Sequence, residues 1–249
     1  MNLTRFIGSS IKSDLVIYVG HILAQMGHRT LIVDASLMKD YQYSFIRTEE
    51  NEVLYDLQNV EIISDVRTFD TLKNQLAIAN EQVENYDYIL VDTNDSCTFS
   101  NWPSFENTYY ISNDVRSNTM KDVEILNDYM DITGLFKVNR IHFESAFSIP
   151  KGYIELLLNN RIEIIDSFEP IEYDDKYEYL SQFIQHEYEI PYNRLNKQYK
   201  NMVRSIVTDI CKVGNADVDA ATGNGIFGIF KRQNLAPNKK GLHELKGVK

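Results

Sequence analysis

The residues whose types and spacing could bind a phosphate group lie in one short segment, residues 7–14, which reads IGSSIKSD. A loop between a strand and a helix N-terminus binds phosphate through backbone N–H groups, a lysine and a Ser or Thr that reaches Mg²⁺. Lys12 and Ser13 supply the last two, and Gly8 and Ser9 form the turn that precedes them. Most of the glycines that such a loop needs are missing.

Two aspartates end apolar runs that are typical of buried central strands. Asp34 closes residues 30–34, and Asp92 closes residues 86–92. Parallel strands place their carboxyl ends at one edge of a sheet, where α/β proteins bind ligands. Asp34, Asp92 and Ser13 are therefore the candidate Mg²⁺ ligands. The alternative interpretation is that both aspartates only cap turns and that Lys12 is an ordinary exposed lysine at a helix start.

The elements that must position these residues alternate between strand and helix patterns. Strands are predicted at residues 3–7, 30–34, 60–64, 86–92, 108–112, 137–143 and 162–166. Helices are predicted at residues 13–26, 51–59, 69–84, 118–130, 177–186 and 195–212. This order predicts a single doubly wound α/β domain, with a mostly parallel sheet and helices on both faces. The domain is expected to span residues 1–212, followed by a Gly-, Asn- and Asp-rich linker at 213–224 and a tail at 225–249.

Composition limits the class of protein. The chain has 249 residues, of which 43% are hydrophobic, so it can bury a sizeable core. Its net charge of −11 argues against nucleic acid as a partner, because phosphate binding needs a cationic surface. Two cysteines, Cys97 and Cys211, are typical of a reducing compartment. With no secretory signal and no apolar stretch long enough to span a bilayer, we expect a cytoplasmic protein.

The tail differs in charge from the rest of the chain. Residues 225–249 contain six Lys or Arg residues and one acidic residue. They begin GIFGIFKR, an apolar run followed by two cations, whose contact residues are Ile226, Phe227, Ile229, Phe230, Lys231 and Arg232. One interpretation is peripheral contact with the inner face of the membrane, with the apolar side chains in the interface and the cations on anionic headgroups. The alternative is docking on the protein's own body or on a partner.

Four segments resemble the MinD/ParA family of deviant Walker ATPases. LAQMG to VDAS (residues 23–36) resembles the family's helix end and second strand, and YDYILVDT (86–93) resembles its Walker B strand. ISNDVRSNTMKD (111–122) and VNRIHFES (138–145) resemble two later segments. Over residues 1–212 the resemblance implies a P-loop NTPase-like fold, a homodimer, ATP with Mg²⁺ as cofactor and Asn139 as an adenine-facing residue.

The loop departs from the family sequence KGGVGKTT at several positions. Ile7 replaces the lysine that reaches the partner's nucleotide, Ser9 replaces a glycine, and Ile11 replaces the glycine before the conserved lysine. A β-branched residue disfavours positive φ and obstructs the approach of a phosphate to the backbone. Asp14 replaces a threonine and adds negative charge at the helix start. That charge suits the helix dipole but repels a phosphate.

The switch regions depart as well. The family's switch-I carboxylate falls at Ser36, and residues 93–96 replace its Pro-containing second switch. Arg5 is one candidate substitute for the lost dimer lysine. Phosphoryl transfer depends on positioning and on charge stabilisation, so the loss of these parts together argues against hydrolysis and for a cofactor-free pseudo-ATPase.

Three functions are compatible with these observations. The first is a non-catalytic or nucleotide-binding-impaired protein that positions or assembles a bacterial cellular machine through dimerisation and partner binding, similar to TadZ/CpaE-like localisation proteins. The second is a slow ATP-dependent switch carried by Lys12, Ser13, Asp34 and Asp92. The third is a ParA-like DNA partition protein, which the acidic body disfavours.

Overall fold

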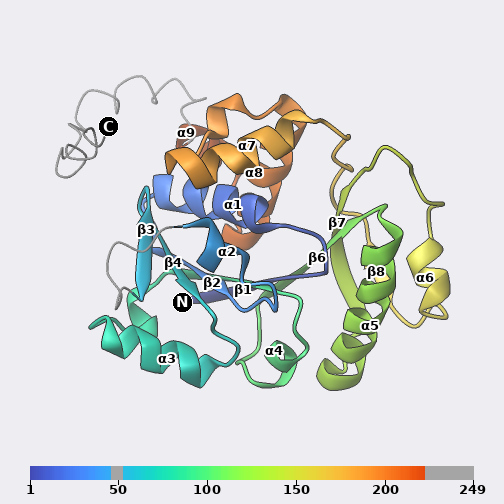
Figure 1. Ribbon diagram of the computed structural model, residues 1–249, viewed down its shortest axis with the longest axis horizontal. Helices are drawn as coiled ribbons and strands as arrows, with labels where there is room; N and C mark the ends of the chain where they lie inside the picture. Colours follow the sequence, from blue (N-terminus) through green and yellow to red (C-terminus); the bar gives the residue numbers. More distant parts are fainter. Residues whose placement is uncertain (46–52, 222–249) are drawn as a thin grey trace, which may run out of the picture.

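An eight-stranded sheet in the order β3-β4-β2-β5-β1-β6-β7-β8 organises the protein, which a computed structural model describes at residues 1–45 and 53–221 (Figure 1). All neighbouring strands pair in parallel except β3, which is antiparallel to β4. The predicted fold class is therefore confirmed. The strands are β1 (Asn2–Ile7), β2 (Thr30–Asp34), β3 (Leu54–Leu57), β4 (Val60–Ser64), β5 (Tyr88–Thr93), β6 (Asn107–Asn113), β7 (Lys137–Phe143) and β8 (Glu163–Ile165).

Helices cover both faces of the sheet (Figure 1). One layer holds α1 (Ser13–Gln25), α2 (Asp40–Ser44), α7 (Lys176–Glu187), α8 (Lys197–Cys211) and α9 (Asn215–Ala221). The other holds α3 (Phe69–Ile78), α4 (Cys97–Ser100), α5 (Arg116–Thr133) and α6 (Tyr153–Leu157). Short 3₁₀ turns lie at Val83–Asn85 and Tyr192–Arg194. Within residues 1–45 and 53–221, no helix combines the length and apolarity that crossing a bilayer requires.

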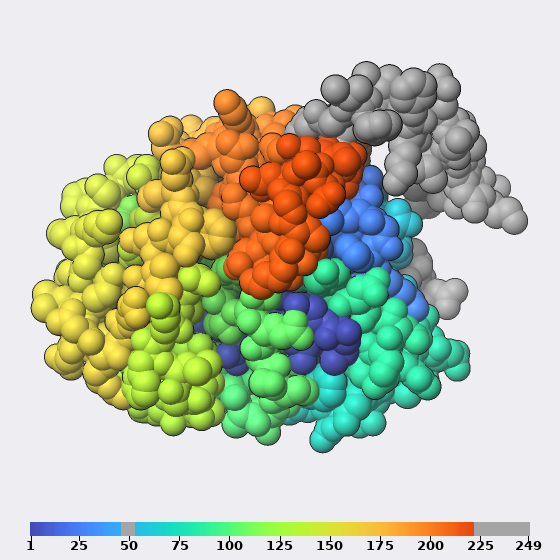
Figure 2. Space-filling model, turned by 180° about the vertical axis from the view of Figure 1, so that it is seen from behind, coloured from blue at the N-terminus to red at the C-terminus, as the bar shows by residue number. Residues whose placement is uncertain are grey.

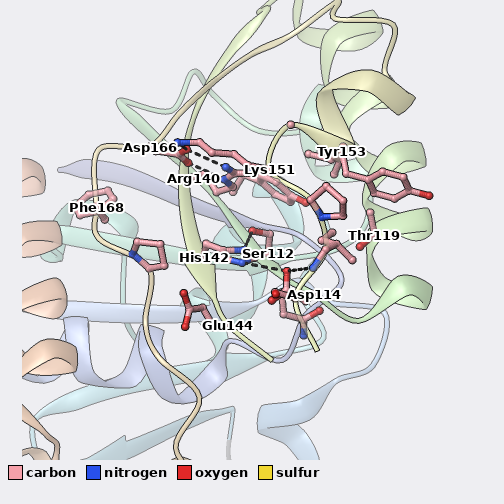
Figure 3. A pocket seen from close by; sticks show the side chains of 18 of the residues that line it. Ser112, Asp114, Thr119, Arg140, His142, Glu144, Lys151, Tyr153, Asp166 and Phe168 are labelled. Carbon is pink, nitrogen blue, oxygen red and sulfur yellow. Dashed lines mark hydrogen bonds and ion pairs between the residues drawn. The ribbon is translucent and has the colours of Figure 1, made fainter. Parts of the chain in front are cut away.

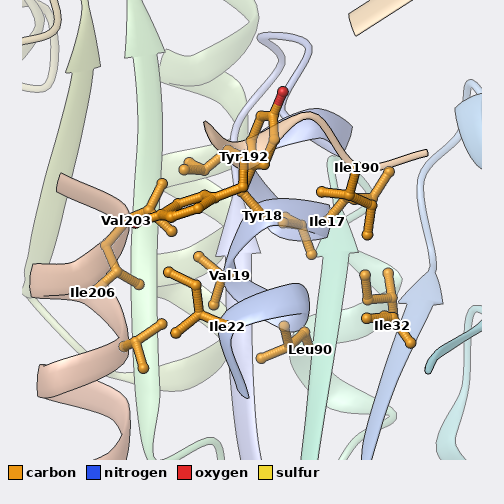
Figure 4. Close-up of a cluster of buried hydrophobic side chains, with 14 of the residues drawn as sticks. Ile17, Tyr18, Val19, Ile22, Ile32, Leu90, Ile190, Tyr192, Val203 and Ile206 are labelled. Carbon is orange, nitrogen blue, oxygen red and sulfur yellow. The ribbon is translucent and has the colours of Figure 1, made fainter. Parts of the chain in front are cut away.

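The largest core lies between the sheet and the layer that contains α1. Tyr18 and Ile22 of α1 face Val203 and other apolar side chains of α8, as well as Ile32 and Leu90 of the central strands (Figure 4). Every residue of β2 is buried, as expected for a strand covered by helices on both faces. Each of its apolar side chains, Leu31, Ile32 and Val33, contributes roughly 1.5–3 kcal/mol by leaving water. This burial fixes where β1, β2 and β5 end, and those ends carry the candidate site.

One predicted helix is wrong. Within the predicted helix at residues 51–59, Leu54–Leu57 forms the antiparallel edge strand β3, while residues 51 and 52 lie outside the described residues. Gln58 and Asn59 both have positive φ and connect β3 to β4 as a two-residue hairpin turn. A turn of this kind matches the twist of the flanking strands. The helix predicted at 69–84 is shorter than expected, because it ends at Ile78 and Asn80 has φ of 59°.

Most of the predicted linker is folded onto the body. Asn215–Ala221 forms α9, and its Val218 is completely buried against α8 and α1. The hydroxyl of Thr208 donates to the Asn215 side chain at 3.0 Å, and Arg204 pairs with Asp219. One buried apolar side chain and two polar contacts thus dock a segment whose composition is typical of a linker. The remainder of the linker from residue 222 and the six tail contact residues between Ile226 and Arg232 lie outside the described residues.

Replacing Val218 with Ala tests whether α9 is part of the folded body. Because the side chain is buried, we expect the free energy of unfolding to fall by roughly 1–2 kcal/mol. Urea unfolding followed by circular dichroism measures the change. Ala220→Ser, at an exposed position of the same helix, is the control and should have almost no effect. An equally small effect of Val218→Ala would mean that α9 does not dock on the body in solution.

Candidate functional site

The loop between β1 and α1 lies directly on the backbone of β6. Gly8 has φ of +131°, and a Cβ atom added there would lie 2.3 Å from the carbonyl oxygen of Ile111. Only glycine fits a position with both this conformation and this contact. Ile11 lies at the tip of the loop with 76% of its side chain exposed. The predicted phosphate-loop glycine is thus explained by packing alone.

Lys12 points back into the loop instead of toward solvent. Its Nζ donates to the carbonyl oxygen of Gly8 at 2.8 Å and lies 2.9 Å from Oδ1 of Asp92, and the residue is only 4% exposed. The expectation of an ordinary exposed lysine is therefore wrong. An ammonium group has three donors, of which one bonds the carbonyl of Gly8, and the amine as a whole is ion-paired with Asp92. A phosphate that approaches this amine must compete with the carboxylate of Asp92 for its positive charge.

The backbone donor of Ser9 is also occupied by the protein. Its N–H donates to Oδ1 of Asp122 on α5 at 2.7 Å, and its hydroxyl donates to the carbonyl of Asn118 at 3.0 Å. The hydroxyl of Tyr110 donates to the other oxygen of Asp122 at 2.9 Å. Burial raises the pKa of Asp122, while the bonds from Ser9 and Tyr110 oppose that rise. A side-chain carboxylate thus holds the loop where a phosphate oxygen would accept.

Asp34 and Asp92 lie side by side at the ends of β2 and β5, as the sequence predicted, and Tyr41 connects them. Its N–H donates to Asp34 at 3.2 Å and its hydroxyl to Asp92 at 3.0 Å. Ser36 donates to Asp34 through both its N–H, at 3.0 Å, and its hydroxyl, at 2.6 Å. Burial raises the pKa of Asp34 to about 6, against the effect of these bonds. In the described part of the chain, no three His, Cys, Asp or Glu side chains are grouped to hold a metal ion.

Ser13 and Asp14 begin α1 beside these carboxylates. Ser13 is 9% exposed, and its carbonyl accepts a bond from the Tyr41 hydroxyl at 3.4 Å. Asp14 is partly buried and accepts a bond from Tyr199 of α8 at 3.3 Å. Burial raises the pKa of Asp14 to about 6. Near neutral pH it therefore places a poorly solvated negative charge at the helix end that would face a phosphate.

A groove of about 610 Å³ opens beside the start of α1, between α2, α7 and the end of β7. It adjoins a hollow of about 240 Å³ that shares Phe143, Tyr177 and Glu178 with it. No lysine or arginine lines either cavity in the described part of the chain. Seven carboxylates do: Asp14, Asp40, Glu144, Glu172, Asp174, Asp175 and Glu178. With Lys12 and Ser9 already engaged, this lining does not fit a nucleoside triphosphate.

Two other residues lie apart from the loop. Asn139 is the third residue of β7, and its side chain accepts a bond from Ser167 at 3.3 Å. Arg5 is 3% exposed, and its guanidinium lies over the rings of Phe99, Phe105 and Tyr129. It cannot reach a partner molecule, so the interpretation of Arg5 as a substitute for the dimer lysine is wrong.

A separate cavity of about 470 Å³ lies at the ends of β6, β7 and β8 (Figure 3). On its floor, the Ser112 hydroxyl lies 2.9 Å from Nδ1 of His142, whose Nε2 lies 3.3 Å from Asp114. Asp114 also accepts bonds from the backbone N–H groups of Ser145 and Ile149. Burial lowers the pKa of His142, which favours the neutral ring. This chain of bonds fastens the segment after β7 to the sheet.

The opposite end of this cavity is closed by an ion pair. Arg140 donates to both oxygens of Asp166, at 2.7 and 2.9 Å, and Lys151 lies 3.8 Å from the same carboxylate (Figure 3). Bidentate geometry of this kind fixes both side chains. The charged groups at this end are therefore paired within the wall and contribute to holding β7 and β8 together.

Several residues of these sites were not predicted from the sequence. Asp122 and Tyr41 close the loop, and Ser112, Asp114 and His142 line the separate cavity. Asp122 carried one signal, because it lies on the same helical face as buried Thr119, Leu126 and Tyr129, where a carboxylate must find a donor. Tyr41 carried none, since Asp92, the partner of its hydroxyl, is 51 residues away in the sequence.

No protein-family profile and no curated protein sequence matches the chain. Among solved structures it is similar to the MinD cell division protein of Aquifex aeolicus, with a TM-score of 0.57 and 13% identity over 86% of this chain and 98% of that one. The MinC:MinD complex of the same organism gives a TM-score of 0.55, with 16% identity over 86% and 97%. A ParA family ATPase from Chlorobium tepidum gives 0.51, with 12% identity over 89% and 97%. At these identities the likeness concerns the fold alone.

Replacing Asp14 with Asn tests the cost of its buried charge. The ordinary pKa of about 3.8 in the unfolded chain rises to about 6 on folding, so the native state binds more protons between these values. Below about pH 4 the carboxyl group is protonated in both states and its burial costs no charge penalty. As the pH rises toward and through 6, the free energy of unfolding falls, because the charged form is disfavoured in the native state. We therefore expect Asp14→Asn to be more stable than the wild type by about 1–3 kcal/mol near pH 7.5, and by about a third of that near pH 4.5.

Urea unfolding at the two pH values measures this difference. Asn can still accept the bond from Tyr199, so the variant removes the charge and retains the contact. Asp128→Asn, at an exposed position of α5, is the control and should change stability little at either pH. A destabilised Asp14→Asn protein near pH 7.5 would show that the carboxylate is stabilising.

Proposed function

We propose that this protein acts without nucleotide hydrolysis, as a positioning or assembly protein of MinD/ParA-like fold that works through dimerisation and partner binding. The observation that carries the proposal is the engagement of Lys12 by Asp92 and by the carbonyl of Gly8. Lys12 and Ser13 are present, but the amine of Lys12 and the N–H of Ser9 are engaged by the protein itself and hold the loop closed. The carboxyl edge of the sheet is then available as a binding surface.

Exposed apolar side chains at that edge support a protein-binding role. Leu37 and Met38, after β2, are 51% and 66% exposed, and Phe147, after β7, is 79% exposed. Val115, after β6, is 44% exposed. Several exposed apolar side chains on the loops of one edge favour a role of that edge in binding a protein. Structural neighbours include a MinC:MinD cell division complex, and assembly with another protein is the property that we propose by analogy.

Isothermal titration with ATP and Mg²⁺, together with a phosphate-release assay, tests the first part of the proposal. Because the loop donors are engaged internally, we expect no binding heat and no hydrolysis above the level of a Lys12→Ala control. Hydrolysis by the wild type that is lost in Lys12→Ala would overturn the proposal. That outcome would favour the slow ATP-dependent switch.

Sedimentation velocity over a range of protein concentrations tests the second part. We expect a dimer, and we expect Met38→Asp/Phe147→Asp to weaken it at least about tenfold, because each charge would be buried in the apolar interface. Ile78→Asp is the matched control, since Ile78 is 69% exposed on α3 at the other side of the molecule. Equal behaviour of the control and the double variant would exclude this surface as the dimer interface.

A further inference from the structure

The chain contains two oppositely charged parts. Residues 225–249 contain six basic residues and Glu244 as their single acid, whereas the whole chain has a net charge of −11. The basic segment begins with the apolar run Ile226, Phe227, Ile229 and Phe230, directly before Lys231 and Arg232. A surface that accepts this segment must combine apolar contacts with carboxylates. It must also be within reach of Ala221, the end of α9.

The groove beside α1 has both properties. Phe143 and Tyr177 belong to the groove and to the adjoining hollow, and Ile11 and Tyr43 line the groove with 76% and 79% of their side chains exposed. Seven carboxylates line the two cavities without a single lysine or arginine from the described residues. Apolar and acidic side chains thus line the same groove, in the combination that the basic segment requires.

The direction of α9 brings the chain toward this groove. Asn215 bonds Thr208 and Asp219 pairs with Arg204, so α9 runs back along α8 toward the N-terminal end of that helix. At that end, Tyr199 bonds Asp14, which lines the groove. Seen from behind, the red end of the described chain lies next to a blue, N-terminal part of the chain (Figure 2), and α9 contacts both α8 and α1.

The connecting length is sufficient. The segment begins at Ile226, five residues after Ala221, and an extended chain of that length spans roughly 16–18 Å. Arg204, the partner of Asp219, lies five residues along α8 from Tyr199, which is about 7.5 Å, and Tyr199 bonds Asp14. A chain that leaves the end of α9 can therefore reach the groove beside the start of α1 without unfolding any described element.

We propose that residues 226–232 of this same chain dock in the groove between α1, α2 and α7. The apolar side chains lie against Phe143, Tyr177 and Tyr43, and the cations Lys231 and Arg232 pair with carboxylates such as Asp40 and Glu178. Ion pairs of this kind at a surface are individually weak and are screened by salt, so the apolar contacts supply the remaining affinity.

This inference is separate from the proposed function. The loop is closed by Lys12, Asp92 and Asp122 whether or not the groove is occupied. A failure of docking would leave the nucleotide titration and the sedimentation result unchanged. Conversely, nucleotide hydrolysis would overturn the proposed function without excluding docking in its absence.

Zero-length carbodiimide cross-linking of the full chain locates the segment, because it joins lysines only to carboxylates in contact. We expect Lys231 to be linked to groove carboxylates within one chain, and the links to disappear in high salt. An equal mixture of ¹⁵N-labelled and unlabelled protein separates links within a chain from links between chains. Links between two chains would show that the tail of a second copy occupies the groove. If Lys231 formed no link to any groove carboxylate, the segment would not dock there. Either result overturns the proposal.

Trypsin cleavage after Lys231 and Arg232 measures the strength of docking in the full chain. Asp40→Asn/Glu178→Gln removes two groove charges and should speed cleavage severalfold, as should high salt in the wild type. Asp70→Asn/Glu84→Gln makes the same charge change at exposed positions on the α3 side and is the matched control. Equal cleavage rates in the two double variants would contradict docking in this groove.

Discussion

The buried ion pair between Lys12 and Asp92 is the interaction on which the rest of the site depends. Both residues are withdrawn from water, and the removal of one partner from such a pair costs about 3–5 kcal/mol because the other charge is left uncompensated. The same amine also bonds the carbonyl of Gly8. One contact therefore fixes the loop after β1, the start of α1 and the end of β5, and any ligand for Lys12 must compete with it.

The surrounding residues reinforce this closed arrangement. Asp122 holds the N–H of Ser9 from the α5 side, and Tyr41 connects Asp34 to Asp92 from the α2 side. In the parts of the chain that the structure describes, the polar groups at this end of the sheet are thus bonded mainly to each other. Other molecules can therefore contact the exposed apolar side chains of this edge and the acidic groove beside α1. The proposed function rests on the exposed side chains, and the proposed docking of the tail rests on the groove.

The sequence predicted most strands and long helices because burial leaves a local pattern in the chain. The continuous apolar runs of β2 and β5 and the helical spacing in α1 are examples. The errors arose where a few contacts outweighed composition. Gln58 and Asn59 adopt positive φ and turn a predicted helix into a hairpin, and Val218 docks a segment that has the composition of a linker. Neither effect leaves a periodic signal.

The sequence by itself determined the order of elements, the place of the loop between β1 and α1, and the residue types in that loop, among them Gly8, Lys12 and Ser13. Only the tertiary structure decided what the remaining groups do. Lys12 finds Asp92 because β1 and β5 are neighbours in the sheet, and Ser9 finds Asp122 because α5 packs beneath β6. Such partners are distant along the chain, so the choice between binding a phosphate and closing on the protein depends on packing.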